Sequence, residues 1–188
     1  MNTSKITLRS ARRDDARIIA EVIAMAIGDE VGLCNYCGQN YLDVLTDVAQ
    51  AEDTQYSWQN TIVAEYEGRV AGAVVGYDGA RLYELRKGTL AVIRRHVGHE
   101  PTIVDETEAG EYYLDSVGVL PAYRGCGVGA ALIEALCRRA FAEGAERVGL
   151  IVDIENPDAE KLYAAHGFER VGERPFFTHR MNHLQRQK

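Results

Sequence analysis

An arginine and three glycines lie within six residues near the middle of the chain, in the segment R-G-C-G-V-G (124–129). An apolar run that ends at Val119 precedes this segment, and a strongly helical stretch follows it. Glycine lets the backbone approach a ligand closely. The unpaired N–H groups of a helix's first turn, together with the helix dipole, favour an anion. The spacing therefore predicts a cradle for a phosphate or pyrophosphate, and the alternative is a tight strand-to-helix turn.

Two other phosphate-binding loops fit this segment less well. Gly125, Gly127 and Ala130 satisfy the G-x-G-x-x-A pattern of dinucleotide-binding folds. However, residues 121–124 separate them from the strand, and only one strand–helix–strand unit is present. No Gly-Lys-Ser/Thr follows, as a nucleotide-binding P-loop requires. A dinucleotide-binding protein remains the less favoured alternative.

The strand before the loop carries two carboxylates that are candidates for a general base. Alternation along this strand predicts one face made of Glu111, Tyr113, Asp115, Val117 and Val119. Asp115 and Glu111 are therefore candidates to take a proton from a nucleophile, directly or through a water molecule. The alternative for each is a salt-bridged or exposed carboxylate.

A second block, N-P-D-A-E-K-L-Y-A-A-H-G-F (156–168), reads as a short helix with a clear start. Asn156 suits the N-cap and Pro157 the first helical position, while Gly167 ends the helix. Tyr163, on this helix, is a candidate general acid. The alternative is an aromatic side chain packed against the core.

The remaining pattern predicts strands and helices around these two blocks. Expected strands lie at 5–9, 60–66, 69–77, 111–119, 147–152, 168–171 and 176–181, and expected helices at 14–27, 41–51, 127–143 and 156–167. Glu67-Gly68 predicts a hairpin turn between the second and third strands. Residues 29–39 read as irregular, and residues 81–96 as one or two helical turns.

The four cysteines do not suggest a disulfide scaffold or a metal centre. Cys34 and Cys37 form a C-x-x-C pair, but a zinc site needs two more ligands at metal spacing. A redox pair or two half-buried thiols are the remaining interpretations. Cys126 lies at a helix start, where a thiol can become reactive. The alternative is a loop residue whose side chain matters little.

Composition limits the class of protein. The chain has 188 residues, 46% hydrophobic and 26% charged, with a formal net charge of −7. An acidic chain of this length predicts one globular domain that does not bind nucleic acid. No apolar run reaches the length of a membrane span, and the first residues lack the apolar core of a signal peptide. We therefore expect a soluble, cytoplasmic protein without a membrane partner.

Both blocks, in this order and with a strand between them, resemble the GNAT superfamily of acetyl-CoA-dependent N-acetyltransferases. The strong resemblance covers about 114–171, and a looser one, including R-S-A-R-R-D-D-A (9–16), covers most of the chain except about 80–110. The resemblance implies an α/β (α+β) fold with a mixed, mostly antiparallel twisted sheet of six to seven strands and about four helices. The sheet would splay between its fourth and fifth strands to hold coenzyme A. The chain would form a single domain over 1–188, with a family-divergent insertion at about 78–110.

The resemblance also implies roles for single residues. Val117, Gly118 and Val119 would offer backbone groups to the pantetheine arm and the thioester. Asn156 would hydrogen-bond the coenzyme arm, and Tyr163 would protonate the leaving sulfur. The pyrophosphate would be wrapped by backbone N–H groups of the loop, formed by Arg124, Gly125, Cys126, Gly127, Val128, Gly129 and Ala130.

The implied reaction is transfer of an acetyl group from acetyl-CoA to a primary amine of a small molecule or peptide, by direct attack in a ternary complex. A domain that binds acetyl-CoA without turnover is the alternative. Residues 29–58 and 78–110 are expected to shape the acceptor pocket. The acidic run D-E-T-E-A-G-E (105–111) is either a solvated loop or a wall that attracts a cationic amine. Exposed edge strands make a homodimer an open possibility.

Overall fold

The computed structural model describes residues 5–99, 101, 103–176 and 179–188, and places seven strands in one sheet. The strand order is β1-β2-β3-β4-β5-β7-β6, and neighbouring strands are antiparallel except β4 and β5, which are parallel. The strands are β1 (Ile6–Ser10), β2 (Thr61–Tyr66), β3 (Arg69–Asp78), β4 (Tyr112–Val119), β5 (Arg147–Asp153), β6 (Glu169–Phe176) and β7 (His179–Gln187). The predicted mixed, mostly antiparallel sheet is confirmed.

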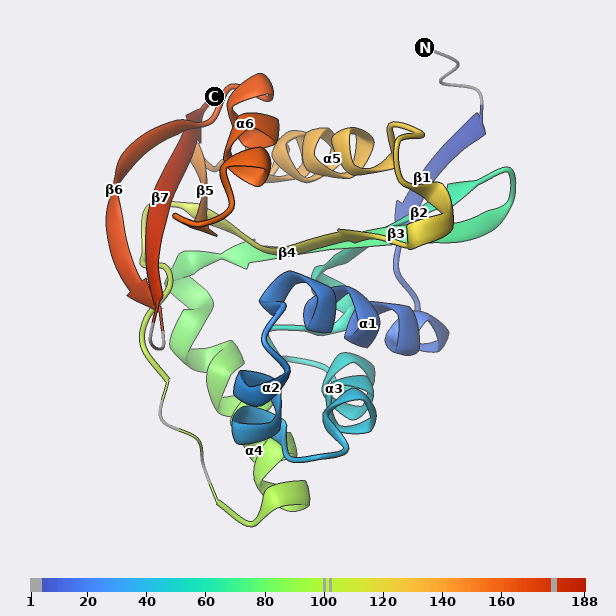
Figure 1. Ribbon diagram of the computed structural model, residues 1–188, viewed down its shortest axis with the longest axis vertical. Coiled ribbons are helices and arrows are strands. Elements are labelled where there is room, and N and C mark those ends of the chain that lie inside the picture. Colours follow the sequence, from blue (N-terminus) through green and yellow to red (C-terminus); the bar gives the residue numbers. More distant parts are fainter. Residues whose placement is uncertain (1–4, 100, 102, 177–178) are drawn as a thin grey trace.

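Helices cover both faces of this sheet (Figure 1). One face carries α1 (Ala16–Ile27), α2 (Glu30–Cys37), α3 (Tyr41–Gln50) and α4 (Leu82–Val97), and the other carries α5 (Val128–Ala142) and α6 (Pro157–Ala165). No helix in the described part of the chain has the length and apolar character needed to cross a membrane.

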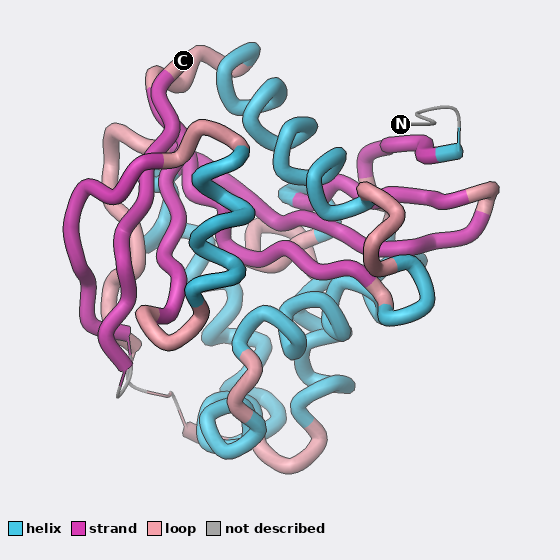
Figure 2. Tube along the Cα trace, turned by 45° about the horizontal axis from the view of Figure 1, so that its top comes forward, coloured by secondary structure: helices cyan, strands magenta, loops and turns pink. Residues whose placement is uncertain are grey.

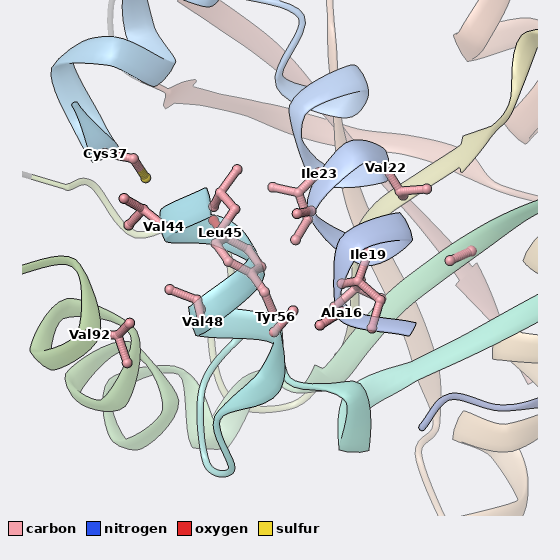
Figure 3. Packing of buried hydrophobic residues seen from close by; sticks show 14 of the residues in the cluster. Ala16, Ile19, Val22, Ile23, Cys37, Val44, Leu45, Val48, Tyr56 and Val92 are labelled. Atoms are coloured by element: carbon pink, nitrogen blue, oxygen red, sulfur yellow. The ribbon is translucent and has the colours of Figure 1, made fainter. Parts of the chain in front are cut away.

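The hydrophobic core is divided by the sheet into two clusters. On one side, Ile19 and Ile23 of α1 pack with Leu45 and Val48 of α3 and with Tyr56 (Figure 3). On the other side, α5 contributes the predicted stripe, and all four of its members are buried: Leu132, Ala135, Leu136 and Ala140. The pattern of helical spacing therefore identified the buried faces correctly.

Glycines end or begin elements at the predicted places because they adopt positive φ. Gly28 follows α1 with φ 66°, and Gly127 precedes α5 with φ 85°. Glu67 and Gly68, both with positive φ, join β2 to β3 and confirm the predicted hairpin.

Two helices were not predicted at their full extent. The segment expected to be irregular contains α2, in which Leu33, Tyr36 and Cys37 are buried. The segment expected to hold one or two helical turns forms α4, a helix of 16 residues. In α4, Gly88 lies against the backbone of Asp53, where a Cβ atom would come within 2.2 Å of the carbonyl oxygen. Tertiary packing thus keeps a poor helix former inside this helix.

The last two strands are longer than predicted. The expected strands at 168–171 and 176–181 correspond to β6, which continues to Phe176, and β7, which continues to Gln187. β7 pairs with β5 from Met181 to Gln187 and with β6 from His179 to Gln185. Pairing with these neighbours holds polar segments in strand conformation that the alternation of residues alone did not identify as strands.

The sheet opens between β4 and β5, as predicted. These strands pair only where Tyr112 faces Val148 and Tyr113 faces Gly149. Beyond Tyr113 the two strands separate, and Figure 2 shows the strands dividing into two diverging groups. The edge of β4 that faces β5 therefore has no strand partner among the described residues from residue 114 onward.

β4 contains a bulge at the same place. Val75 of β3 pairs with Ser116 and Gly76 pairs with Leu114, so Asp115 is the extra residue. A one-residue shift moves all later side chains to the opposite face. Val117 and Val119 consequently pack against the α5 cluster, whereas Asp115 bonds the Tyr77 hydroxyl, on the other side of the sheet. The prediction that Asp115, Val117 and Val119 share one face is wrong for this reason.

Candidate functional site

The opening between β4 and β5 forms a cavity of about 510 Å³, called the split cavity below. Its walls come from the end of α1, the strands β4 and β5, and the start of α6. The lining includes the predicted residues Val117, Asn156 and Tyr163, together with Asp115, Ser116 and Ala159. Three of the predicted binding residues, far apart in sequence, are thus brought to one cavity.

The glycine-rich loop follows β4 and leads directly into α5. Gly125 and Gly127 have positive φ, and no side chain among the described residues caps the helix. The first backbone bond at this helix end runs from the Ala131 N–H to the Gly127 carbonyl. The N–H groups of residues 128–130 therefore lie at an uncapped helix N-terminus, which is suited to an anion.

Two further residues of the loop carry exposed side chains. The Arg124 Nε donates to the Val119 carbonyl at 3.4 Å, and the Cys126 Sγ lies 3.8 Å from the Arg124 carbonyl.

Gly118 of β4 is packed closely against α1, because a Cβ atom there would meet Val22 and Met25 of α1 at 3.3 Å. α1 therefore lies directly against the backbone of β4.

α6 presents Asn156 and Tyr163 to the split cavity. The Asn156 Oδ1 accepts a hydrogen bond from the Ala159 N–H at 3.1 Å, so Asn156 is the N-cap that the sequence predicted. The Tyr163 ring meets Phe168 edge-on at 5.8 Å between centroids. Burial raises the pKa of Tyr163 to about 12, which keeps its hydroxyl protonated at neutral pH.

A second cavity, of about 230 Å³, lies between the sheet and α1 and α2, and is called the helical cavity below. Its aromatic lining includes Tyr36, Tyr56, Tyr113 and Phe176, and its polar lining includes Gln55, Ser116 and the carboxylates Asp29, Glu106, Asp115 and Asp153. No Lys, Arg or His is among the described residues that line it. The helical cavity is therefore negatively charged.

The two cavities meet at Asp115 and Ser116, which line both of them. The Asp115 carboxylate accepts hydrogen bonds from the Tyr77 hydroxyl at 3.0 Å and from the Ser116 hydroxyl at 2.9 Å. Burial raises the pKa of Asp115 above its usual range in spite of these two bonds. The bulge in β4 places this carboxyl group at the junction.

Glu106 is a residue of this site that the sequence did not single out as a catalytic candidate. It is 6% exposed and lines the helical cavity. Its carboxylate accepts from Gln55 Nε2 at 2.9 Å and pairs with Arg86 at 3.2 Å. Burial and the nearby charge of Asp115 raise the pKa of Glu106. No motif or periodicity marks Glu106 within the acidic run, so only the tertiary structure reveals it.

Glu111 lies outside both cavities. It accepts hydrogen bonds from Thr107 at 2.7 Å, from His183 at 2.9 Å and from Gln185 at 2.7 Å. Burial opposes the charged form, but these three bonds outweigh it and lower the pKa of Glu111. The structure thus brings Asp115, and not Glu111, to the split cavity. It also shows that an entirely solvated acidic loop is the wrong interpretation, because Glu106 and Glu111 are buried.

The C-x-x-C pair lies on α2, beside the helical cavity. Cys37 is buried, which raises the pKa of its thiol to about 12, and Cys34 is half-buried. In the part of the chain that the structure describes, no three His, Cys, Asp or Glu side chains are grouped so as to hold a metal ion.

Comparisons with known proteins agree with this architecture. The model of the Acetyltransferase (GNAT) family matches residues 33–168. The protein ML0378 of Mycobacterium leprae is 35% identical over 112 residues, which are 60% of this chain and 28% of that protein. The acetyltransferase Atu2258 of Agrobacterium fabrum is 31% identical over 111 residues, which are 58% of this chain and 80% of that protein. The chain thus spans less than a third of ML0378 and most of Atu2258.

Two solved structures are similar over nearly the whole chain. One, described as an acetyltransferase, is 31% identical with a TM-score of 0.81, covering 96% of this chain and 98% of that one. The other, an N-acetyltransferase from Staphylococcus aureus Mu50, is 26% identical with a TM-score of 0.82, covering 95% and 99%. Together with the family match over 33–168, these similarities show that the chain belongs to the GNAT family of acetyltransferases.

Proposed function

We propose that the protein is an N-acetyltransferase that moves the acetyl group of acetyl-CoA to a primary amine. The observation that carries this proposal is the meeting of two cavities at Asp115 and Ser116. The split cavity suits the arm of a thioester, and the acidic helical cavity suits an amine. Both substrates would therefore reach the junction from opposite sides in one ternary complex, as direct attack requires.

Three features of the chain fit acetyl-CoA. The uncapped start of α5, at residues 127–130, suits the pyrophosphate, with Arg124 beside it. The β4 edge at residues 117–119 has no strand partner toward β5 among the described residues, so the backbone groups on this edge, apart from the Val119 carbonyl that accepts from Arg124, are open to the amide groups of the coenzyme arm. Asn156 keeps its side-chain amide N–H groups for the same arm, since only its oxygen is used as the N-cap.

Asp115 and Tyr163 would perform the proton transfers. Asp115 takes a proton from the amine, directly or through a water molecule, while the amine nitrogen bonds the carbonyl carbon. Backbone N–H groups of the open β4 edge stabilise the oxyanion. The carbon–sulfur bond then breaks, and Tyr163 donates its hydroxyl proton to the departing sulfur. The products are an N-acetylated amine and coenzyme A, and solvent restores both residues.

A turnover assay tests this proposal. Release of the coenzyme A thiol from acetyl-CoA is followed over a panel of primary amines of different charge and size. Tyr163→Phe is expected to lower kcat about 100-fold and to change the KM for acetyl-CoA by less than about twofold, because a general acid acts only in the chemical step. Tyr41→Phe, on α3, is the matched control and is expected to retain the wild-type kcat.

The outcome also separates the enzyme from its main alternative. Turnover with at least one amine, reduced in Tyr163→Phe, supports the proposal. Binding of acetyl-CoA without turnover on any amine would indicate a sensor domain instead.

A further inference from the structure

The charges around the inner part of the helical cavity do not balance. Glu106 and Asp115 supply two carboxylates there, and Arg86, which pairs with Glu106 and with the exposed Asp105, is the one cation that pairs with them among the described residues. Arg86 bonds Asp105 and Glu106, while Asp115 is bonded by hydroxyl groups alone. Buried carboxylates are costly unless a positive charge lies nearby. The arrangement therefore favours a cationic ligand.

Gln55 provides an independent indication of the same kind. Its side chain is 2% exposed and lines the helical cavity. Its Nε2 donates to Glu106 at 2.9 Å and to the Tyr77 hydroxyl at 3.0 Å, which fixes the amide orientation. The Oε1 atom, in contrast, has no hydrogen-bond partner in the described part of the chain. Gln55 Oε1 is thus a buried acceptor without a donor, and an ammonium group carries three N–H donors.

The two carboxylates are joined by a chain of hydrogen bonds. It runs from Glu106 through the Gln55 amide and the Tyr77 hydroxyl to Asp115, with lengths of 2.9, 3.0 and 3.0 Å. The terminal oxygens are thus at most about 9 Å apart, given ordinary hydrogen-bond lengths. Asp115 lines both cavities, whereas Glu106 and Gln55 line only the helical cavity. One end of this chain faces the junction and the other lies away from it.

We propose that the acceptor is a short aliphatic diamine, whose reacting amine lies beside Asp115 and whose second ammonium group binds the Glu106 carboxylate and Gln55 Oε1. The position of the reacting amine rests on the proposed function. The second ammonium group donates to the unpartnered oxygen and offsets the excess negative charge. Tyr36 and Tyr56 line the same cavity and supply aromatic surface that attracts cations. Glu106 and Gln55 are specificity determinants in this account.

The test compares two ligands that differ only in the second charge. Binding of 1,4-diaminobutane and of n-pentylamine, which has a methyl group in place of the second ammonium, is measured by calorimetry on the protein without cosubstrate. Because a charged hydrogen-bonded group is recognised at one end, the diamine is expected to bind at least about tenfold more tightly. Glu106→Gln is expected to weaken binding of the diamine far more than binding of n-pentylamine, and so to remove this preference.

Glu108→Gln is the matched control, because Glu108 lies in the same acidic segment but is exposed and pairs with Arg174. It removes the same charge and is expected to keep the full preference for the diamine. Equal affinity of the wild-type protein for the two ligands would overturn the inference, whether or not Glu106→Gln folds. A preference that Glu108→Gln abolishes as completely as Glu106→Gln would also overturn it, since the effect would then be long-range.

This measurement is separable from the test of the proposed function. If n-pentylamine is acetylated as efficiently as 1,4-diaminobutane, the protein is an acetyltransferase but the proposed site for the second ammonium group is contradicted. Tight, Glu106-dependent binding of the diamine without any turnover would support the site and contradict the enzyme.

Discussion

The pKa values of Glu111, Asp115 and Glu106 are shifted in different directions because the groups around each carboxylate differ. Glu111 is surrounded by donors from Thr107, His183 and Gln185, and its pKa is lowered. Asp115 and Glu106 are also buried, but their donors do not outweigh desolvation, and their pKa values are raised. A group with a raised pKa is a better proton acceptor near neutral pH. Position at the junction and pKa therefore both favour Asp115 as the base over Glu111.

Replacement of Asp115 by asparagine is expected to change the pH dependence of kcat. A base must be ionised, so kcat of the wild-type enzyme is expected to fall as pH drops through the raised pKa of Asp115. This decline is expected at a higher pH than the value of about 3.9 for an ordinary aspartate would give. Asp115→Asn is expected to lower kcat about 100-fold and to lose that decline. The pH dependence of kcat at saturating substrates, from pH 5 to 9, provides the measurement.

Glu111→Gln is the comparison for this experiment. It removes a buried carboxylate of the same strand region that lies outside both cavities, so its folded enzyme is expected to keep the wild-type pH dependence of kcat. A pH dependence that disappears in Glu111→Gln and persists in Asp115→Asn would reverse the two assignments.

Sequence reasoning reached part of this site. Asp115 was identified from its position on the strand before the loop, whereas the roles of Tyr163 and Asn156 were implied by the resemblance to the GNAT superfamily, and the N-cap signal of Asn156 is local. Glu106 was considered only as part of the acidic run 105–111, and Gln55 only as part of the segment 29–58 expected to shape the acceptor pocket, since the importance of each comes from burial and from their mutual contact. No pattern within a few residues of either one encodes that contact.

At the level of helices and loops, single residues fix the positions of the side chains proposed to bind acetyl-CoA. Asn156 caps α6 and so fixes the helix that carries Tyr163. Gly127, with φ 85°, lets the chain turn from the loop into α5. Each of these two residues can therefore be tested by substitution.

Two substitutions of Asn156 separate its structural role from its proposed binding role. Aspartate keeps an N-cap oxygen but lacks the amide N–H groups, whereas alanine lacks both. Asn156→Ala is expected to lower the free energy of unfolding by about 1 kcal/mol, and Asn156→Asp by much less. Both are expected to weaken acetyl-CoA binding. Chemical denaturation and calorimetry measure the two effects, and unchanged acetyl-CoA affinity in Asn156→Asp would refute the binding role.

A second pair of substitutions tests the glycine loop. Gly127→Ala places a Cβ atom in the left-handed region, so it is expected to cost about 1–2 kcal/mol of stability. In Gly129→Ala the added Cβ would contact Val119 at an ordinary 3.5 Å, and φ is not positive there. That variant is expected to unfold like the wild-type protein. Equal stability losses in the two variants, measured by urea denaturation, would show that backbone strain is not the cause.

There are physical reasons why α2, the full length of α4 and the bulge in β4 were not predicted from the sequence. α2 has no continuous apolar stripe: Val31 is 70% exposed although Leu33 is buried. α4 contains Gly88, which is tolerated because it lies against the backbone of Asp53. The bulge at Asp115 depends on the register with β3, and register is a property of two strands. Helices with strong caps and stripes were predictable, whereas these features need tertiary contacts.

Across the molecule as a whole, the open sheet joins the acidic helical cavity to the split cavity, and both cavities are lined by Asp115 and Ser116. Residues of α1 and α2 line the helical cavity, and residues at α6 line the split cavity. These helices lie on opposite faces of the sheet (Figure 1). Burying unbalanced carboxylates inside such a structure should reduce its stability. The proposed diamine site therefore has a consequence for folding that can be measured without any ligand.

The wild-type protein and the Glu106→Gln variant are expected to differ in how their free energy of unfolding depends on pH. Glu106 has a raised pKa in the folded protein, so the folded state holds a proton that the unfolded chain releases above about pH 4.3. Its contribution is present at low pH and is lost as pH rises through the raised pKa. Glu106→Gln is therefore expected to lose less stability than the wild-type protein between pH 5 and 8. The difference is on the order of 1.4 kcal/mol for each unit by which the pKa is raised.

Urea denaturation at several pH values provides this measurement. Carboxylates that do not interact with Glu106 contribute to both proteins alike, so the difference between the two curves reports Glu106 together with Asp115, whose charge interacts with it. Parallel curves for the two proteins would show that Glu106 is not a group with a raised pKa.

Calorimetric titration of the wild-type protein with acetyl-CoA, with NADH and ATP as controls, tests whether the split cavity and the glycine loop bind the acetyl donor. The open β4 edge, the uncapped α5 N-terminus and Asn156 predict micromolar binding of acetyl-CoA and no comparable binding of NADH or ATP. Binding of NADH alone, or of none of the three ligands, would contradict the account of the split cavity and its glycine loop.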